Sequence, residues 1–403
     1  MKEAISRRPV LWAFVAFCAT FVVSLPINRV IMTKYFVEPS RAFDLNFYLN
    51  IASRGYESPN ETAFYPLWPV VISALHGILS EDFFVQSANL LSLIMFFVSL
   101  RIIWSFAIQL TNRETANWAV FLFALNPNSI FHGIAYPESL FSLLSALCLL
   151  MSLKFFSGPS MRTGLSLFSV TALMSASRPI LLQLLAAGVG SIVTTLILFR
   201  HQENITSFRR TSLRWLSITG SATALGYAPY GYYCWQKFGN FFQPFSAQSA
   251  WDRKFGFYWT LITNPVSVSS SDNILTWDIQ AFYLPSLLIV LFLFHKSRNE
   301  SLMQNKESPV TLNTSDPSRS FLIVFCLMVA AAHSAIAFLT YPIFMSLARH
   351  VFSTPLFFIG ATAVIHDIIP AKPRKKILGF YILVSVLYLV NFWTRFGKSS
   401  WMG

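Results

Sequence analysis

Apolar runs long enough to cross a lipid bilayer recur along the whole sequence. A helix rises about 1.5 Å per residue, so about 20 apolar residues span the roughly 30 Å hydrocarbon core. Several runs approach or exceed that length, and only 12% of the residues are charged, against about 25% in soluble domains. Hydrocarbon offers the backbone no hydrogen-bond partners, which favours helices. The sequence therefore predicts an all-α, polytopic membrane protein.

We expect about eleven transmembrane helices in a single domain over residues 1–403, with further helices on the outer membrane surface. The N-terminal run is over-long for a signal peptide and lacks a clear small-residue cleavage site, which predicts an uncleaved first helix. The four cysteines lie far apart in apolar runs, so neither a disulfide framework nor a metal site is expected. The predicted spans cover residues 10–31, 83–110, 115–131, 139–156, 163–177, 180–199, 215–233, 280–294, 321–339, 349–366 and 377–394.

Clusters of lysine and arginine set the expected orientation. They lie at residues 2–8, 200–214, 296–306 and 372–376, and all four fall in the cytoplasm if the chain alternates through these spans from a cytoplasmic N-terminus. Anionic lipid is a sufficient partner for the net charge of +13, so no nucleic acid is expected. The predicted location is a bacterial cytoplasmic membrane in preference to the endoplasmic reticulum.

Three polar segments interrupt the apolar pattern. Residues 32–82 form the first outer loop, which holds six of the seventeen acidic residues. Within it we expect an amphipathic surface helix over 43–54 and a helix over 63–79 that lies on or dips into the outer leaflet. Residues 234–279 form an aromatic outer loop, and the polar segment 295–320 is predicted to be a flexible cytoplasmic linker.

Acidic, basic and aromatic side chains gather on the predicted outer face. Charged residues in a membrane usually face protein or water, because exposure to hydrocarbon is costly. Arginine pairs with phosphate oxygens, and a carboxylate can take a proton from a hydroxyl. The set therefore fits a reaction that joins a lipid phosphate to a polar acceptor. The candidate site residues are Asp44, Tyr48, Tyr136, Glu138, Arg178, Gln248, Trp251, Arg253, Arg349 and His350.

Each of these residues also has a structural interpretation. Arg349 could be an anchor that reaches the membrane surface, Glu138 a helix N-terminal carboxylate, and Asp44 an N-cap. The tryptophans and tyrosines could form an interface belt. Two other function classes remain open: a transporter or lipid flippase, which would show paired repeats and polar groups at mid-membrane, and a non-catalytic assembly subunit, which would tolerate loss of Asp44.

Four sequence blocks resemble the PIG-V family, the second mannosyltransferase of GPI-anchor assembly, and its bacterial relatives. The blocks occur in the family's order between residues 43 and 355. The chain departs from the family pattern at Phe43, Asn128 and His350, where the family has Trp, Ala and Tyr. The blocks are FDLNFYLNIASRGY followed by AFYPLWP, then NPNSIFHGIAYPESLF, PFSAQSAW and RHVFSTP.

This resemblance implies a GT-C-like glycosyltransferase with its active site on the extracytoplasmic face. The donor would be a polyprenyl-phosphate sugar, usually mannose, and the acceptor a lipid or glycan hydroxyl. The family's essential acid in the first outer loop corresponds to Asp44. We therefore expect an inverting transfer with Asp44 as general base, while Arg349, or else Arg178 or Arg253, stabilises the departing phosphate.

The other carboxylate on this face has two expected roles. Glu138, together with Tyr136, would orient the acceptor or the sugar. No cofactor is firmly predicted, although Asp44 and Glu138 could together hold a divalent cation.

Overall fold

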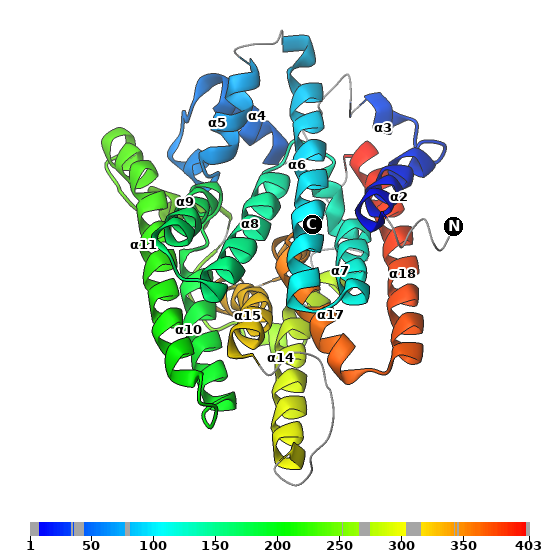
Figure 1. Cartoon of the computed structure of the whole chain (residues 1–403). Coiled ribbons are helices and arrows are strands. Elements are labelled where there is room, and N and C mark those ends of the chain that lie inside the picture. The colour runs from blue at the N-terminus through cyan, green and yellow to red at the C-terminus, as the bar shows by residue number, and fades with distance from the viewer. Residues whose placement is uncertain are drawn as a thin grey trace.

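Helices make up the architecture of the computed structural model (Figure 1). The described residues are 8–33, 35, 44–76, 81–251, 253–265, 275–303, 316–341, 343–344 and 346–399. The longer helices are α2 (Pro9–Ser24), α6 (Glu81–Leu110), α7 (Arg113–Leu125), α8 (Glu138–Ser157), α9 (Met161–Ser177), α10 (Leu181–Leu198), α11 (Ile205–Phe238), α14 (Leu275–Met303), α15 (Pro317–Thr340), α17 (Pro355–Ile368) and α18 (Ala371–Gly397). The shorter ones are α3 (Val30–Met32), α4 (Asp44–Arg54), η2 (Pro59–Ala63), α5 (Leu67–His76), η3 (Pro127–His132), α12 (Gln243–Ser246), η4 (Ala247–Trp251), α13 (Thr260–Thr263) and α16 (Leu347–Phe352).

Six helices of the described chain are long and apolar enough to cross a membrane. They are α6, α8, α10, α14, α15 and α18, while α2 and α17 are apolar but shorter. The prediction of an all-helical, multi-pass membrane protein is confirmed. Each predicted span coincides with one helix or with two consecutive helices, and six of these helices meet the length and composition of a membrane span within the described residues.

Two prolines divide predicted spans into shorter helices. Asn126 precedes Pro127 and is extended (φ −72°, ψ 154°), which ends α7 before η3 begins. Thr354 precedes Pro355 and is also extended (φ −114°, ψ 147°), which separates α16 from α17. The residue before a proline disfavours the helical region for steric reasons. Both breaks leave short helices, η3 and α16, that carry or support polar residues of the site described below.

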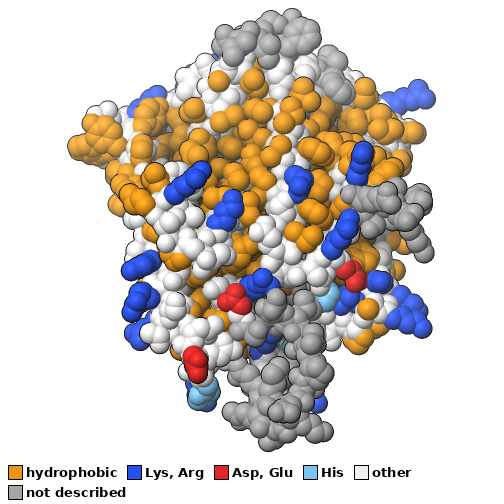
Figure 2. Space-filling model, viewed as in Figure 1, with side chains coloured by type: hydrophobic (Ala, Val, Ile, Leu, Met, Phe, Trp, Pro, Cys, Tyr) orange, Lys and Arg blue, Asp and Glu red, His pale blue; other side chains and the backbone are white. Residues whose placement is uncertain are grey.

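The core lies where α8, α15 and α17 pack together, and residues 355–364 of α17 are all buried. The outer helix α18 instead exposes Phe380, Leu383 and Leu387. Figure 2 shows a broad band of hydrophobic side chains across the molecule, with most of the visible Lys and Arg side chains around and below its lower edge. Exposed apolar rows of this kind suit contact with lipid.

Helix α11 is 34 residues long and packs against α9. Gly226 permits their close approach, because a Cβ there would lie 2.2 Å from the carbonyl oxygen of Ala172. Farther along α11, the hydroxyl of Tyr230 donates to the carbonyl oxygen of Thr62 at 2.8 Å. This hydrogen bond attaches η2, which contains Thr62, to helix α11.

The segment predicted as the first outer loop contains a helix at each of the two expected positions. Helix α4 confirms the helix expected over residues 43–54, and α5 lies within residues 63–79. Both lie beside the upper end of α6 in Figure 1. The Trp68 indole N–H donates to the carbonyl oxygen of Ala135 at 3.0 Å, and the Tyr56 hydroxyl donates to that of Phe64 at 2.6 Å. The first bond attaches α5 to the chain just before α8, and the second lies within the stretch between α4 and α5.

Two predicted loops are shorter than expected, because the neighbouring helices run farther. Helix α11 continues to Phe238 and ends at Gly239, whose positive φ of 75° suits a helix C-terminus. Helix α14 continues to Met303, so the first nine residues of the segment 295–320 are helical. Helix α15 begins within the same segment, where Asp316 accepts from the N–H of Ser318 at 2.9 Å as an N-cap. The residues between these two helices lie outside the described chain.

Candidate active site

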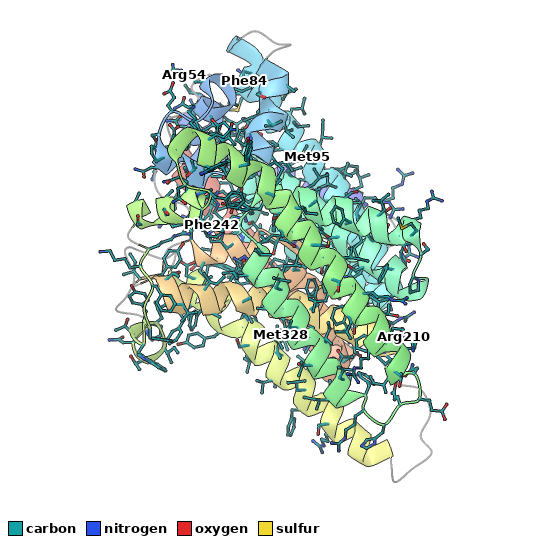
Figure 3. The ribbon with its side chains drawn as sticks, turned by 90° about the vertical axis from the view of Figure 1, so that its left-hand side faces the viewer. Arg54, Phe84, Met95, Arg210, Phe242 and Met328 are labelled. Carbon is teal, nitrogen blue, oxygen red and sulfur yellow. The ribbon has the colours of Figure 1, made fainter. Side chains whose placement is uncertain are left out.

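A cavity of about 620 Å³ lies at the end of the bundle that carries α4, a size typical of small-molecule sites. In Figure 3, the labelled residues Arg54 of α4 and Phe242 beside α12 mark this end of the bundle, and Arg210 of α11 lies at the opposite end. The cavity is lined by Asp44, Phe47, Tyr48, Ala63, Phe64, Tyr65, Ser177, Arg178, Pro179, Ile180, Gln183, Gln248, Arg253, His333, Ile336, Ala337, Tyr341, Ile343, Phe344, Ser346, Leu347, Arg349 and His350.

Arg349 lies between two carboxylates. Its Nε donates to Oε1 of Glu138 at 2.5 Å, and its Nη1 donates to Oδ2 of Asp44. The guanidinium also packs over the rings of Phe131 and Tyr136, 4.7 and 4.6 Å from their centroids. The position between Asp44 and Glu138, where a divalent cation was conceivable from the sequence, therefore holds a guanidinium instead.

Glu138 is the shared partner of two arginines. It is the first residue of α8 and its side chain is fully buried. Arg178, at the end of α9, also donates to Oε1 of Glu138 and packs over the ring of Phe141 at 5.1 Å. Arg178 precedes Pro179 and is extended, which turns the chain out of the helix at this point. Oε2 of Glu138 is buried and has no hydrogen-bond partner in the part of the chain that the structure describes.

The position of Arg349 is set by the short helix α16. Ser346 precedes that helix with φ 60°, a left-handed conformation that turns the chain sharply into it. The carboxylate of Asp278, on α14, accepts from the N–H of Ala348 at 2.6 Å. Asp278 therefore satisfies an N–H at the start of α16 that the helix itself leaves unpaired. The sequence prediction did not include Asp278.

The aromatic loop supplies Arg253 and Gln248. Arg253 Nη1 donates to Oε1 of Gln248 at 2.6 Å, and its guanidinium lies 4.3 Å from the ring centroid of Tyr341. Burial lowers the pKa of Arg253 to about 10, against the opposing effect of Asp44. The backbone beside it is attached to α15, since Lys254 N–H donates to the carbonyl oxygen of Thr340 at 3.2 Å.

The structure brings most of the predicted site residues to this cavity. Tyr136 and Glu138 do not line it but contact Arg349 from behind. The side chain of Trp251 lies outside the described residues. His333 and Tyr341, which the sequence did not single out, also line the cavity, and the rings of His333 and His350 stack with centroids 6.2 Å apart. The predicted residues that line it are Asp44, Tyr48, Arg178, Gln248, Arg253, Arg349 and His350.

These features define an all-helical integral membrane protein with a cavity at one end that carries a carboxylate, arginines and aromatic rings. The chain belongs to the mannosyltransferase (PIG-V) family, whose profile matches residues 13–389. The family predicted from the four sequence blocks is thereby confirmed.

Part of the chain is also similar to two curated proteins. It is 34% identical over 114 residues to GPI mannosyltransferase 2 of Drosophila pseudoobscura pseudoobscura, which covers 26% of this chain and 25% of that protein. It is 31% identical over 111 residues to GPI mannosyltransferase 2 of Drosophila melanogaster, covering 25% of each. The matched segments thus span about a quarter of these relatives.

Solved structures similar to this chain include an oligosaccharyltransferase of Archaeoglobus fulgidus. The form with a tethered acceptor peptide has a TM-score of 0.43 and 12% identity over 97% of this chain and 55% of that one. The form in complex with an inhibitory peptide and a dolichol-phosphate has a TM-score of 0.45 and 11% identity, over 97% and 56% of the two chains.

Proposed function

We propose that this protein is an integral-membrane mannosyltransferase that moves mannose from a polyprenyl-phosphate donor to a hydroxyl of a lipid-linked or glycan acceptor. Membership of the PIG-V family supports the reaction class. The observation that carries the proposal is the cavity in which Asp44 faces a group of arginines. Such a pairing suits both halves of the reaction, since a carboxylate can accept the hydroxyl proton and guanidinium groups can bind phosphate.

The proposed mechanism places Asp44 as the general base. Its Oδ2 accepts from Arg349, and no hydrogen bond to Oδ1 is found among the described residues, so Oδ1 is the oxygen that takes the proton. As the proton leaves, the acceptor oxygen forms a bond to the anomeric carbon of mannose. The bond from that carbon to the phosphate oxygen breaks on the opposite face, and its electron pair leaves with the polyprenyl phosphate. The configuration at the anomeric carbon is inverted.

The remaining polar residues hold this geometry or meet the substrate. Because Glu138 and Tyr136 lie behind Arg349, we assign them a positioning role through that arginine instead of direct contact with sugar. Tyr48, Gln248 and His350 line the cavity and are proposed to contact the donor or the acceptor. Phe47 and Phe64, whose rings stack 4.6 Å apart, offer an apolar wall.

We further propose a GT-C-like arrangement with this cavity on the extracytoplasmic face of a bacterial cytoplasmic membrane, in a chain that crosses the bilayer about eleven times. One observation supports the orientation: Arg210, within a basic cluster, lies at the opposite end from Arg54 of α4 in Figure 3. Trp235, Phe242 and Trp259 are exposed aromatic residues of the kind found at either membrane interface, so they support a position near an interface but not its side.

A transfer assay tests the proposed function. The purified protein is reconstituted in lipid with radiolabelled polyprenyl-phosphate-mannose and a panel of candidate glycolipid acceptors. We expect a labelled product whose new linkage has the anomeric configuration opposite to that of the donor. Absence of product with every acceptor, together with movement of intact donor across the vesicle membrane, would favour a lipid transporter and overturn the proposal.

A further inference from the structure

We propose that Arg253, and not Arg349, carries the phosphate of the donor, while Arg349 is a positioning residue for the two carboxylates. The inference rests on the proposed function and names the residue within its site that recognises the leaving group. It revises the prediction from sequence, which placed Arg349 first among the phosphate-binding candidates.

Arg349 already has its strong hydrogen bonds within the protein. Its Nε and Nη1 donate to Glu138 and Asp44, two different carboxylates. The planar group is also packed over the rings of Phe131 and Tyr136. A phosphate drawn to this guanidinium would compete with two carboxylates for its positive charge, and pulling it away from Asp44 would disturb the proposed base. The arrangement therefore fits a guanidinium that orients Asp44.

The charge of Arg178 is also paired within the protein. Its Nη2 donates to Oε1 of Glu138, the same oxygen that Arg349 contacts. Its guanidinium lies against the ring of Phe141, and its side chain is only 11% exposed. Because two guanidinium groups share one carboxylate oxygen, loss of either contact would leave a buried charge with weaker compensation.

Arg253 lines the same cavity without a carboxylate partner among the described residues. Its Nη1 donates to the neutral amide oxygen of Gln248, and its flat face rests on Tyr341. Its Nε is buried and makes no hydrogen bond to any described residue. A buried, unpaired N–H is unfavourable and gains most from a charged acceptor. Arg253 is thus held in place by neutral groups, with its charge left for a ligand.

The balance of charges around the cavity also indicates Arg253 as the phosphate-binding residue. If the histidines are uncharged, Asp44 and Glu138 offset the charges of Arg178 and Arg349, with which they form ion pairs. Among the described residues that line the cavity, the positive charge of Arg253 then remains. A polyprenyl-phosphate sugar is a phosphodiester with one negative charge, so a single uncompensated guanidinium matches it.

Binding of polyprenyl monophosphate and of uncharged polyprenol to the purified protein tests the inference without requiring sugar transfer. We expect Arg253→Gln to weaken binding of the phosphate about 10- to 100-fold, the range for a charge-assisted hydrogen bond, with polyprenol binding unchanged. The matched control is Lys254→Gln, which removes the neighbouring exposed charge outside the cavity lining and should change phosphate binding less than about twofold.

A charge-balanced double variant tests the role given to Arg349. Arg349→Gln with Asp44→Asn removes one positive and one negative charge, so the net charge is unchanged, Glu138 keeps Arg178 as its partner, and phosphate binding should stay within about threefold of the wild type. Should Arg253→Gln fail to fold, Arg253→Lys replaces it. This variant should weaken phosphate binding at least about threefold, because an ammonium group cannot reproduce the planar, paired N–H donors of a guanidinium.

The outcomes separate this inference from the proposed function. Wild-type affinity for polyprenyl monophosphate in both Arg253 variants, or loss of that affinity in the charge-balanced double variant, would overturn the assignment of Arg253. If the wild-type protein binds the phosphate through Arg253 but transfers no mannose, the assignment stands as a phosphate site and the proposed reaction fails.

Discussion

Replacing Glu138 with glutamine should lower the free energy of unfolding by about 3–5 kcal/mol, the range for removing one partner of a buried ion pair. The Glu138 side chain is 0% exposed, and its Oε1 accepts from both Arg349 and Arg178. Arg349 would keep Asp44 as a partner, whereas Arg178 has no other carboxylate partner among the described residues. Most of the cost should therefore come from the uncompensated charge of Arg178.

Asp316 provides the matched control for this measurement. Its carboxylate is 48% exposed and lies 3.9 Å from Arg319, whose side chain is 30% exposed. Exposed ion pairs contribute only about 0–1 kcal/mol, and asparagine can keep the N-cap of α15, so Asp316→Asn should have a small effect. Unfolding is measured at equilibrium in mixed micelles of a mild detergent and dodecyl sulfate, followed by tryptophan fluorescence.

A second variant identifies the charge responsible. Glu138→Gln combined with Arg178→Gln removes both partners and should be more stable than Glu138→Gln alone. Two results would refute the reasoning: equal losses for Glu138→Gln and Asp316→Asn, or a double variant less stable than the single one.

Three further predictions follow from the same contacts and from the proposed orientation. Arg349→Lys should lower the rate of mannose transfer about 10- to 100-fold, because a point charge cannot hold two carboxylates; transfer at the wild-type rate would contradict the positioning role. Asp278→Ala should lower the free energy of unfolding by about 1 kcal/mol, as loss of a helix cap does. It should also slow mannose transfer, because α16 would lose this contact; an unchanged transfer rate would show that Asp278 does not help to position the site. A cysteine placed at exposed Asn60 should react with an impermeant thiol reagent from outside intact cells, whereas one at exposed Arg210 should not; labelling of position 210 would reverse the proposed orientation.

The helices were largely predictable from local sequence. Apolar runs indicated the spans, and the spacing of Asp44, Tyr48 and Ala52 indicated the surface helix that the structure shows as α4. Gly55, with φ 76°, ends that helix as a glycine in this position commonly does. Features of this kind depend on residues close in sequence, so they could be predicted without the tertiary structure.

The partners within the site could not be predicted in this way. Arg349 and Glu138 are 211 residues apart, and their contact depends on how α8 and α16 pack. Asp278 lies next to a predicted span with no local pattern that indicates α16 as its partner. The sequence also ranked Arg349 above Arg253 for phosphate, because it did not reveal that the charge of Arg349 is already paired within the protein.

Transfer of labelled mannose by Asp44→Asn is the most direct test of the central claim. Asparagine has nearly the same size but cannot accept the hydroxyl proton, and loss of a general base typically lowers the rate about 10²–10⁴-fold. The N-cap interpretation predicts almost no change, because asparagine caps a helix about as well as aspartate. We expect this variant to fold, to reach the membrane at wild-type levels and to transfer almost no mannose. Near-normal transfer would exclude Asp44 as the base and contradict the account.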